Sequence, residues 1–133
     1  MHIVFGGAFN GKRQFVQDRL TGQVDWYEEI LPEASNHTTV TTGLEEWIYG
    51  QLEQGASEAH IVKQVQGALD KQQVNIHIWI LTDISRGIVP LDPLDRQWRD
   101  ATGRIYQLLF KEAQSITRIW YGLPENLKGD GWT

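Results

Sequence analysis

A glycine-rich loop that ends in a lysine is the clearest sign of chemistry in this sequence. It spans Gly6–Arg13, follows the apolar run Ile3–Phe5 and precedes a stretch with helical character. Glycines let several backbone N–H groups converge on one phosphate, while a helix N-terminus and a lysine add positive charge. The chain meets the spacing G-x-x-x-x-G-K of a phosphate-binding loop. We therefore predict phosphate binding by Gly6, Gly7, Ala8, Phe9, Asn10, Gly11, Lys12 and Arg13.

The residue after the lysine departs from this motif. A phosphate-binding loop has Ser or Thr there, whose hydroxyl binds Mg²⁺, whereas this chain has Arg13. A guanidinium could supply positive charge in place of Mg²⁺, but it cannot bridge two phosphates as an octahedral metal does. Arg13 therefore argues against Mg²⁺ binding, and we assign no metal ligands. Loss of catalytic activity is a better explanation of Arg13 than a guanidinium that takes over the role of Mg²⁺. The alternative is a glycine turn that only joins a strand to a helix.

A second group of charged residues follows the apolar segment 76–81. Asp83 comes at its end, and Arg96 and Arg99 lie three residues apart on an expected helix, so that they share one face. Arginines at the rim of a binding site suit a phosphate or a carboxylate. Asp83, Arg96 and Arg99 are therefore candidate ligand contacts. The alternatives are a turn-capping role for Asp83 and ion pairs, within the helix or between subunits, for the two arginines.

The order of the expected elements places both groups at one edge of a sheet. Strands are expected at residues 2–5, 38–42, 76–81 and 116–121, with a further extended segment at 24–30, and helices at 11–21, 44–52, 57–69 and 92–113. Alternating strands and helices predict a mostly parallel sheet, which binds ligands at the carboxyl ends of its strands. We expect residues 1–133 to form one three-layer α/β domain of the P-loop NTPase (RecA-like) type, with about five strands and a loose tail after Pro124.

Composition narrows the functional classes. Of the 133 residues, 41% are hydrophobic, enough for a core, and the net charge of −5 argues against nucleic acid as a partner. There are no cysteines, which excludes disulfides, thiolate catalysis and cysteine-based metal centres. The N-terminus lacks a secretory signal, and no apolar run approaches the ~20 residues of a membrane span. We therefore expect a cytoplasmic protein without a membrane partner.

Histidines and a pair of glutamates are the remaining candidates for chemistry. The four histidines have no metal-ligand spacing, and His77 lies in an apolar strand, where a hydrogen-bonded core residue is expected. His37 and His60 lie in polar parts of the sequence. Glu45 and Glu46 are expected on the solvated face of a helix. We therefore assign no catalytic residue.

Two motifs at opposite ends of the chain are found together in one known family. The first is the loop, matched at Gly6, Gly7, Ala8, Gly11 and Lys12, and the second lies at about residues 76–124 and ends in Gly122, Leu123 and Pro124. In this second motif, Asp83 and Trp98 stand for a Glu and a Phe of the family pattern, and the other matching residues are Gly87, Ile88, Val89, Pro90, Arg96, Arg99, Asp100, Gly103 and Gln107. The chain thus resembles the bifunctional adenosylcobinamide kinase / adenosylcobinamide-phosphate guanylyltransferases of cobalamin biosynthesis, over residues 1–20 and about 76–124.

This resemblance implies a phosphoryl transfer to a cobinamide, followed by GMP transfer through a histidine. It also implies GTP or ATP as the nucleotide, a corrinoid as the second ligand and a homotrimeric assembly. These reactions require positioned phosphates, Mg²⁺ and a nucleophilic histidine. Whether this chain can carry out the reactions depends on the positions that would bind Mg²⁺ and supply the histidine.

Several of those positions differ from the family pattern. Arg13 replaces the loop Ser, Thr42 falls where a core strand ends in an acid, and the segment that holds the family's histidine is missing before Trp26. Thr82 and Tyr106 replace two asparagines. We therefore expect a shortened, degenerate member that binds a nucleotide, with guanylyl transfer lost and no Ser or Thr to support kinase activity. The alternative is a non-catalytic scaffold or regulatory interaction protein that keeps the fold.

Overall fold

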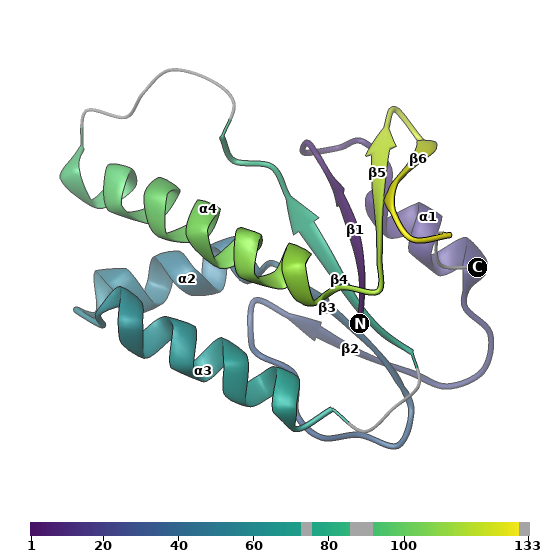
Figure 1. The fold of residues 1–133 in the computed structure, drawn as a ribbon, viewed down its shortest axis with the longest axis horizontal. Coiled ribbons are helices and arrows are strands. Elements are labelled where there is room, and N and C mark those ends of the chain that lie inside the picture. Colours follow the sequence, from purple (N-terminus) through teal and green to yellow (C-terminus); the bar gives the residue numbers. More distant parts are fainter. Residues whose placement is uncertain (73–75, 86–91, 131–133) are drawn as a thin grey trace.

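The computed structural model describes residues 1–72, 76–85 and 92–130, and it is built around one six-stranded sheet (Figure 1). The strand order is β2-β3-β4-β1-β5-β6. The first five strands in this order are parallel, and β6 is antiparallel to β5. The strands are β1 (His2–Gly6), β2 (Val24–Glu28), β3 (Thr38–Thr42), β4 (His77–Thr82), β5 (Ser115–Trp120) and β6 (Leu123–Lys128).

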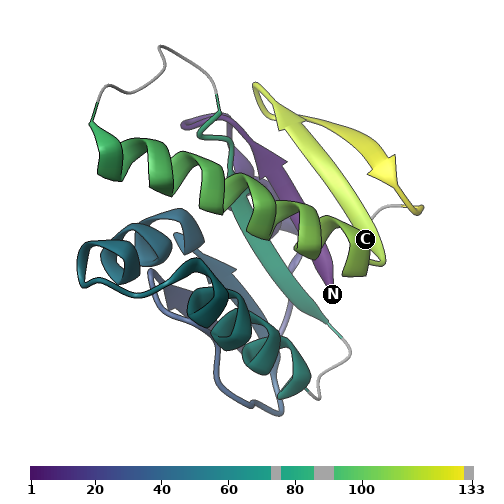
Figure 2. The same ribbon diagram turned by 60° about the vertical axis from the view of Figure 1, so that its left-hand side comes forward.

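Four helices of the described residues cover the two faces of this sheet. They are α1 (Lys12–Arg19), α2 (Leu44–Glu53), α3 (Glu58–Asp70) and α4 (Pro93–Glu112). Helices α2, α3 and α4 lie together on one face, and α1 packs on the other (Figures 1 and 2). The chain is therefore a three-layer α/β structure, as expected. None of these helices is both long and apolar enough to cross a lipid bilayer.

The buried side chains alternate between the two faces of the central strands. In β4, Trp79 and Leu81 pack under α2 and α4, whereas Ile78 and Ile80 pack against α1. Because both faces of β4 are covered, its sequence is an unbroken apolar run rather than an alternating one. The core thus consists of two clusters, one on each side of the sheet.

Local capping explains where two of the helices begin. The Ser57 hydroxyl accepts a hydrogen bond from the backbone N–H of His60 at 3.2 Å, and α3 begins at the next residue. At α4, Asp92 Oδ1 accepts from the N–H of Leu94 at 2.8 Å, and Pro93 occupies the first turn. Both caps match the helix starts expected from the sequence.

The C-terminal tail is the main correction to the expected fold. The segment after Pro124 was expected to be loose, but Leu123–Lys128 pairs with β5 and makes the sheet six-stranded. Its residues are largely exposed, and an edge strand of this kind is held by backbone pairing rather than by an apolar pattern. The Lys128 ammonium also donates to the carbonyls of Phe110 and Lys111 at 3.0 and 2.9 Å, at the end of α4. The segment 24–30, expected only to be extended, contains the opposite edge strand, β2.

Candidate functional site

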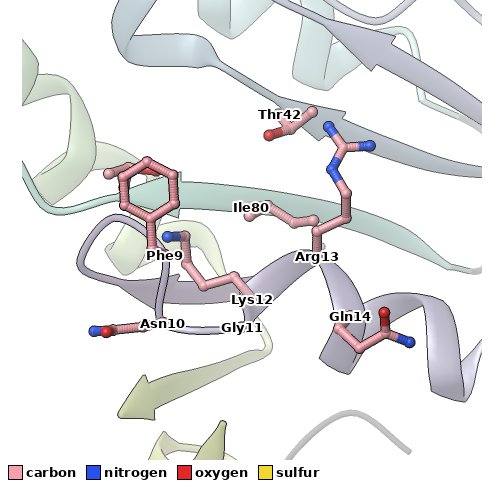
Figure 3. A pocket seen from close by; sticks show the side chains of 9 residues that line it. Phe9, Asn10, Gly11, Lys12, Arg13, Gln14, Thr42 and Ile80 are labelled. Atoms are coloured by element: carbon pink, nitrogen blue, oxygen red, sulfur yellow. The ribbon is translucent and has the colours of Figure 1, made fainter. Parts of the chain in front are cut away.

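The glycine-rich loop lies beside a pocket of about 440 Å³ at the carboxyl ends of the central strands (Figure 3). Gly6, Thr42 and Thr82 are the last residues of β1, β3 and β4, and so the pocket lies at the edge where ligands of parallel sheets bind. Its lining residues are Phe9, Asn10, Gly11, Lys12, Arg13, Gln14, Thr42, Ile80 and Thr82.

The loop backbone has the conformation that its glycines allow. Gly11 is left-handed, with φ of 88°, and it directly precedes α1, whose first turn has no side-chain cap. Phe9 is also left-handed, with φ of 60°, a conformation that is strained for a residue with a side chain. The N–H of Gly122 donates to the carbonyl of Asn10 at 2.8 Å and holds the loop against the β5–β6 turn. An uncapped helix N-terminus beside such a loop is suited to bind an anion.

Lys12 is folded into the loop. Its ammonium donates to the carbonyl of Gly7 at 2.6 Å, and only 7% of the residue is exposed. Burial lowers the pKa of Lys12, and the negative charge of Glu45 opposes that effect in part. The lysine is thus a partly desolvated cation beside the pocket. A phosphate bound there would favour its charged form, which burial disfavours.

Arg13 has a different set of contacts. Its side chain extends toward Thr42 in Figure 3, but its guanidinium pairs with the carboxylate of Glu28 and lies over the ring of Trp26, 5.0 Å from the ring centroid. Both partners belong to β2. The residue that replaces the metal-binding Ser or Thr of the motif is therefore engaged at the rim of the pocket.

We expect Arg13→Ala to lower the free energy of unfolding by at most about 1 kcal/mol, because half-exposed ion pairs and exposed cation–π contacts contribute little. Urea denaturation at low and high salt measures the loss. Arg104→Ala, which removes an exposed pair with Glu58, is the matched control. A loss for Arg13→Ala well above that bound, insensitive to salt, would contradict this assignment.

Glu45 is the residue of this region whose placement differs most from the sequence expectation. It was expected on a solvated helix face, yet it is only 8% exposed, whereas its neighbour Glu46 is exposed as expected. Burial raises the pKa of Glu45, and interactions with Thr82 and Lys12 act in the opposite direction. Its Oε2 atom is buried without a hydrogen-bond partner among the described residues. The turn at Gly43, which joins β3 directly to α2, brings this carboxyl to the pocket edge of the sheet.

The second group of candidates lies apart from the Lys12 pocket. Asp83 Oδ1 accepts from the N–H and hydroxyl of Ser85 at 2.9 and 2.6 Å, which is the turn-capping arrangement considered from the sequence. Asp83 borders a separate hollow of about 210 Å³ with Gly7 and Trp120. Arg99 donates to the carbonyl of Ser85, and Arg96 is exposed on α4. A ligand contact by Asp83, Arg96 or Arg99 stays a prediction, and residues 87–90 of the same motif lie outside the described residues.

His77 differs from expectation in its hydrogen bonding. It is buried, at 3% exposure, and its ring lies 5.3 Å from that of Trp79 between centroids. Its Nε2 atom has no hydrogen-bond partner among the described residues, although a bonded core histidine was expected. Burial lowers the pKa of His77 to about 4. It is therefore a neutral core residue at the opposite end of β4 from Thr82, which lines the pocket, and we expect it to affect stability rather than chemistry.

The residues around the pocket do not suit Mg²⁺. Arg13 occupies the position of the hydroxyl ligand, and Thr42 ends β3 where a carboxylate would be needed. Among the described residues, no group of three or more His, Asp or Glu side chains is placed to hold a metal ion.

Comparisons with known proteins add no assignment. A scan against known protein families finds no match, and no curated protein is significantly similar to the chain in sequence. The resemblance to the adenosylcobinamide kinase / guanylyltransferase family therefore stays a prediction.

Proposed function

We propose that this chain binds the phosphate groups of a nucleotide, GTP or ATP, in the Lys12 pocket. The observation that carries the proposal is the combination of loop, lysine and helix N-terminus at the carboxyl end of β1. Lys12 is nearly buried there, and no side chain caps the first turn of α1. We further propose that the fold is of the P-loop, RecA-like type and descends from the adenosylcobinamide kinase / guanylyltransferase family.

In this proposal the site binds a nucleotide but does not transfer its groups. Binding needs only free N–H groups and a positive charge, for which the uncapped first turn of α1 and Lys12 are the proposed sources. Transfer of GMP would need a histidine nucleophile, and none of the residues that line the pocket is a histidine. Incubation with labelled GTP should leave the protein unlabelled, and acid-labile labelling of a histidine would contradict the loss.

We expect a nucleotide to raise the melting temperature of the protein and Lys12→Ala to abolish the rise. A ligand at 100 times its Kd stabilises the folded state by about 2.7 kcal/mol, which corresponds to a shift of several degrees. Thermal shift with ATP and GTP, each with and without Mg²⁺, measures this. The rise should not require Mg²⁺. Lys63→Ala, which removes an exposed lysine of α3, is the control and should keep the rise.

The rival proposal is a non-catalytic scaffold or regulatory interaction protein. It is supported by exposed apolar side chains on the β5–β6 hairpin: Trp120, Tyr121, Leu123 and Leu127. If neither nucleotide shifts the melting temperature at millimolar concentration, nucleotide binding is wrong and this proposal is favoured. From the family resemblance we also propose a corrinoid as a second ligand and a homotrimeric assembly. Light scattering measures the assembly.

A further inference from the structure

A buried carboxyl lies next to the cationic end of the phosphate site. Glu45 lies in the first turn of α2, immediately after the Gly43 turn, and Thr82, with which it interacts, lines the Lys12 pocket. The charges of Glu45 and Lys12 act on each other, each shifting the other's pKa toward the charged form. An acidic side chain in the interior normally has full hydrogen bonding. Glu45 is only 8% exposed, and one of its two carboxyl oxygens, Oε2, has no hydrogen-bond partner among the described residues.

The elements around Glu45 hold its backbone and restrict its side chain. From α4, the indole N–H of Trp98 donates to the Glu45 carbonyl at 2.7 Å. Tyr106, also on α4, approaches the carboxyl, while its hydroxyl donates to the carbonyl of Thr82 at 2.8 Å. Glu46, on the same turn of α2, adds a second negative charge. Among these neighbours, Lys12 is the cation that stabilises an ionised Glu45.

A bound phosphate would change this balance. The ammonium of Lys12 would then interact with two anions, and the phosphate would place further negative charge close to the nearly buried carboxylate of Glu45. Two like charges in a desolvated site disfavour each other's ionised form. The carboxyl can relieve the repulsion by binding a proton from solvent on its free oxygen, which neutralises it and gives that oxygen an O–H group.

We propose that Glu45 is a positioning residue of the phosphate site: it balances the charge of Lys12 when the site is empty and takes up one solvent proton when a phosphate binds there. The inference depends on the proposed nucleotide binding. Glu45 is not itself among the residues that line the pocket; it interacts with the lining residue Thr82 and acts on the phosphate through Lys12. The phosphate affinity should then decrease as the pH rises through the pKa of Glu45, which burial has already raised.

The first experiment titrates the side-chain carboxyl of Glu45 by NMR in protein labelled with ¹³C at glutamate Cδ. Lys12→Met should raise the pKa of Glu45, because it removes the positive charge that favours the carboxylate. Addition of ATP or GTP without Mg²⁺ should raise the same pKa in the unmodified protein. Neither measurement needs a Glu45 variant to fold. An unchanged pKa in Lys12→Met would overturn the coupling, whether or not a nucleotide binds.

The second experiment measures ATP and GTP affinity calorimetrically between pH 5 and 8. In the unmodified protein, uptake of one proton by Glu45 should lower the affinity by up to about tenfold per pH unit, between the pKa of the carboxyl in the free protein and its higher pKa in the complex. Glu45→Gln should bind more tightly at high pH and lose this contribution, whereas Glu45→Asp should retain it. Glu46→Gln, which removes the exposed neighbouring charge, is the control. Ionisation of the nucleotide itself contributes equally to every variant.

The outcomes separate the two proposals. Nucleotide binding with an unchanged Glu45 pKa, or with the same pH profile in Glu45→Gln, would overturn the role of Glu45 and leave nucleotide binding intact. Absence of binding by both nucleotides would refute the proposed function and this inference with it. A merely structural Glu45 would lower stability on substitution without moving the pH profile of binding.

Discussion

Replacing His77 by phenylalanine should abolish most of the decrease in stability that the protein undergoes between pH 6.5 and pH 4. His77 is buried, and burial is the main reason for the decrease of its pKa from 6.5 to about 4. The positive charges of the N-terminal amine and of His2 contribute in the same direction. Because the unfolded chain binds this proton more tightly than the folded protein does, stability falls as the pH drops through 6.5, and the loss is complete below about 4.

The expected size of this loss is about 3 kcal/mol, since each pKa unit corresponds to 1.36 kcal/mol. Urea denaturation from pH 7.5 to 4 should show a shallower decline in His77→Phe than in the unmodified protein. At pH 7.5 the variant should be at least as stable, because the substitution removes the unbonded buried Nε2. His77→Leu serves as a smaller replacement if the phenyl ring does not fit.

His60→Gln is the control, since His60 is exposed on α3. It removes an imidazole from the surface and leaves His77 in place. If the decline between pH 6.5 and 4 is equally steep in both His77 variants and in the control, His77 is not its source, and the buried histidine must find a proton acceptor or a route to water in the folded protein.

The sequence predicted the interior of the fold better than its edges. The β4 run is apolar on both faces and is found at the centre of the sheet, the cap expected at Ser57 precedes α3, and α4 begins within one residue of its expected start at residue 92. These signals are local consequences of burial and of unpaired backbone groups. β6 could not be found in the same way, because its residues are exposed and its stability comes from pairing with β5, a partner that periodicity does not reveal.

The candidate site was predictable only in part for a similar reason. The loop and Lys12 are consecutive in sequence, and so their spacing alone indicated a phosphate site. Glu45 comes from a different element, and its sequence context, Leu44-Glu45-Glu46-Trp47, is that of an ordinary amphipathic helix start. Its burial results from the contact of α2 with α4 and from the turn at Gly43, neither of which leaves a pattern in the chain. The pairing of Arg13 with Glu28 likewise depends on the sheet edge formed by β2.

Gly6 is the loop residue for which the structure predicts the largest effect on folding. A Cβ atom at Gly6 would lie 2.5 Å from the carbonyl oxygen of Ile119, closer than such atoms approach in proteins. That oxygen belongs to the backbone of β5 and cannot rotate away. The Gly6 carbonyl in turn accepts from the N–H of Asp83 at 2.8 Å. A side chain at this position would therefore separate β1 from β5 and disturb the end of β4 at the same time.

We expect Gly6→Ala to lower the free energy of unfolding by about 3 kcal/mol, the upper end of the range for overpacking a rigid interior. Gly7→Ala is the matched control: a Cβ there would meet the amide end of the Asn10 side chain at 3.1 Å, which a small rotation relieves. Urea denaturation of the two variants measures the difference directly. Equal losses would mean that β5 moves away from the loop without a penalty, in which case the loop is not held by the sheet. A large loss confined to Gly6→Ala would show that the close contact between β1 and β5 fixes the position from which the loop reaches the pocket.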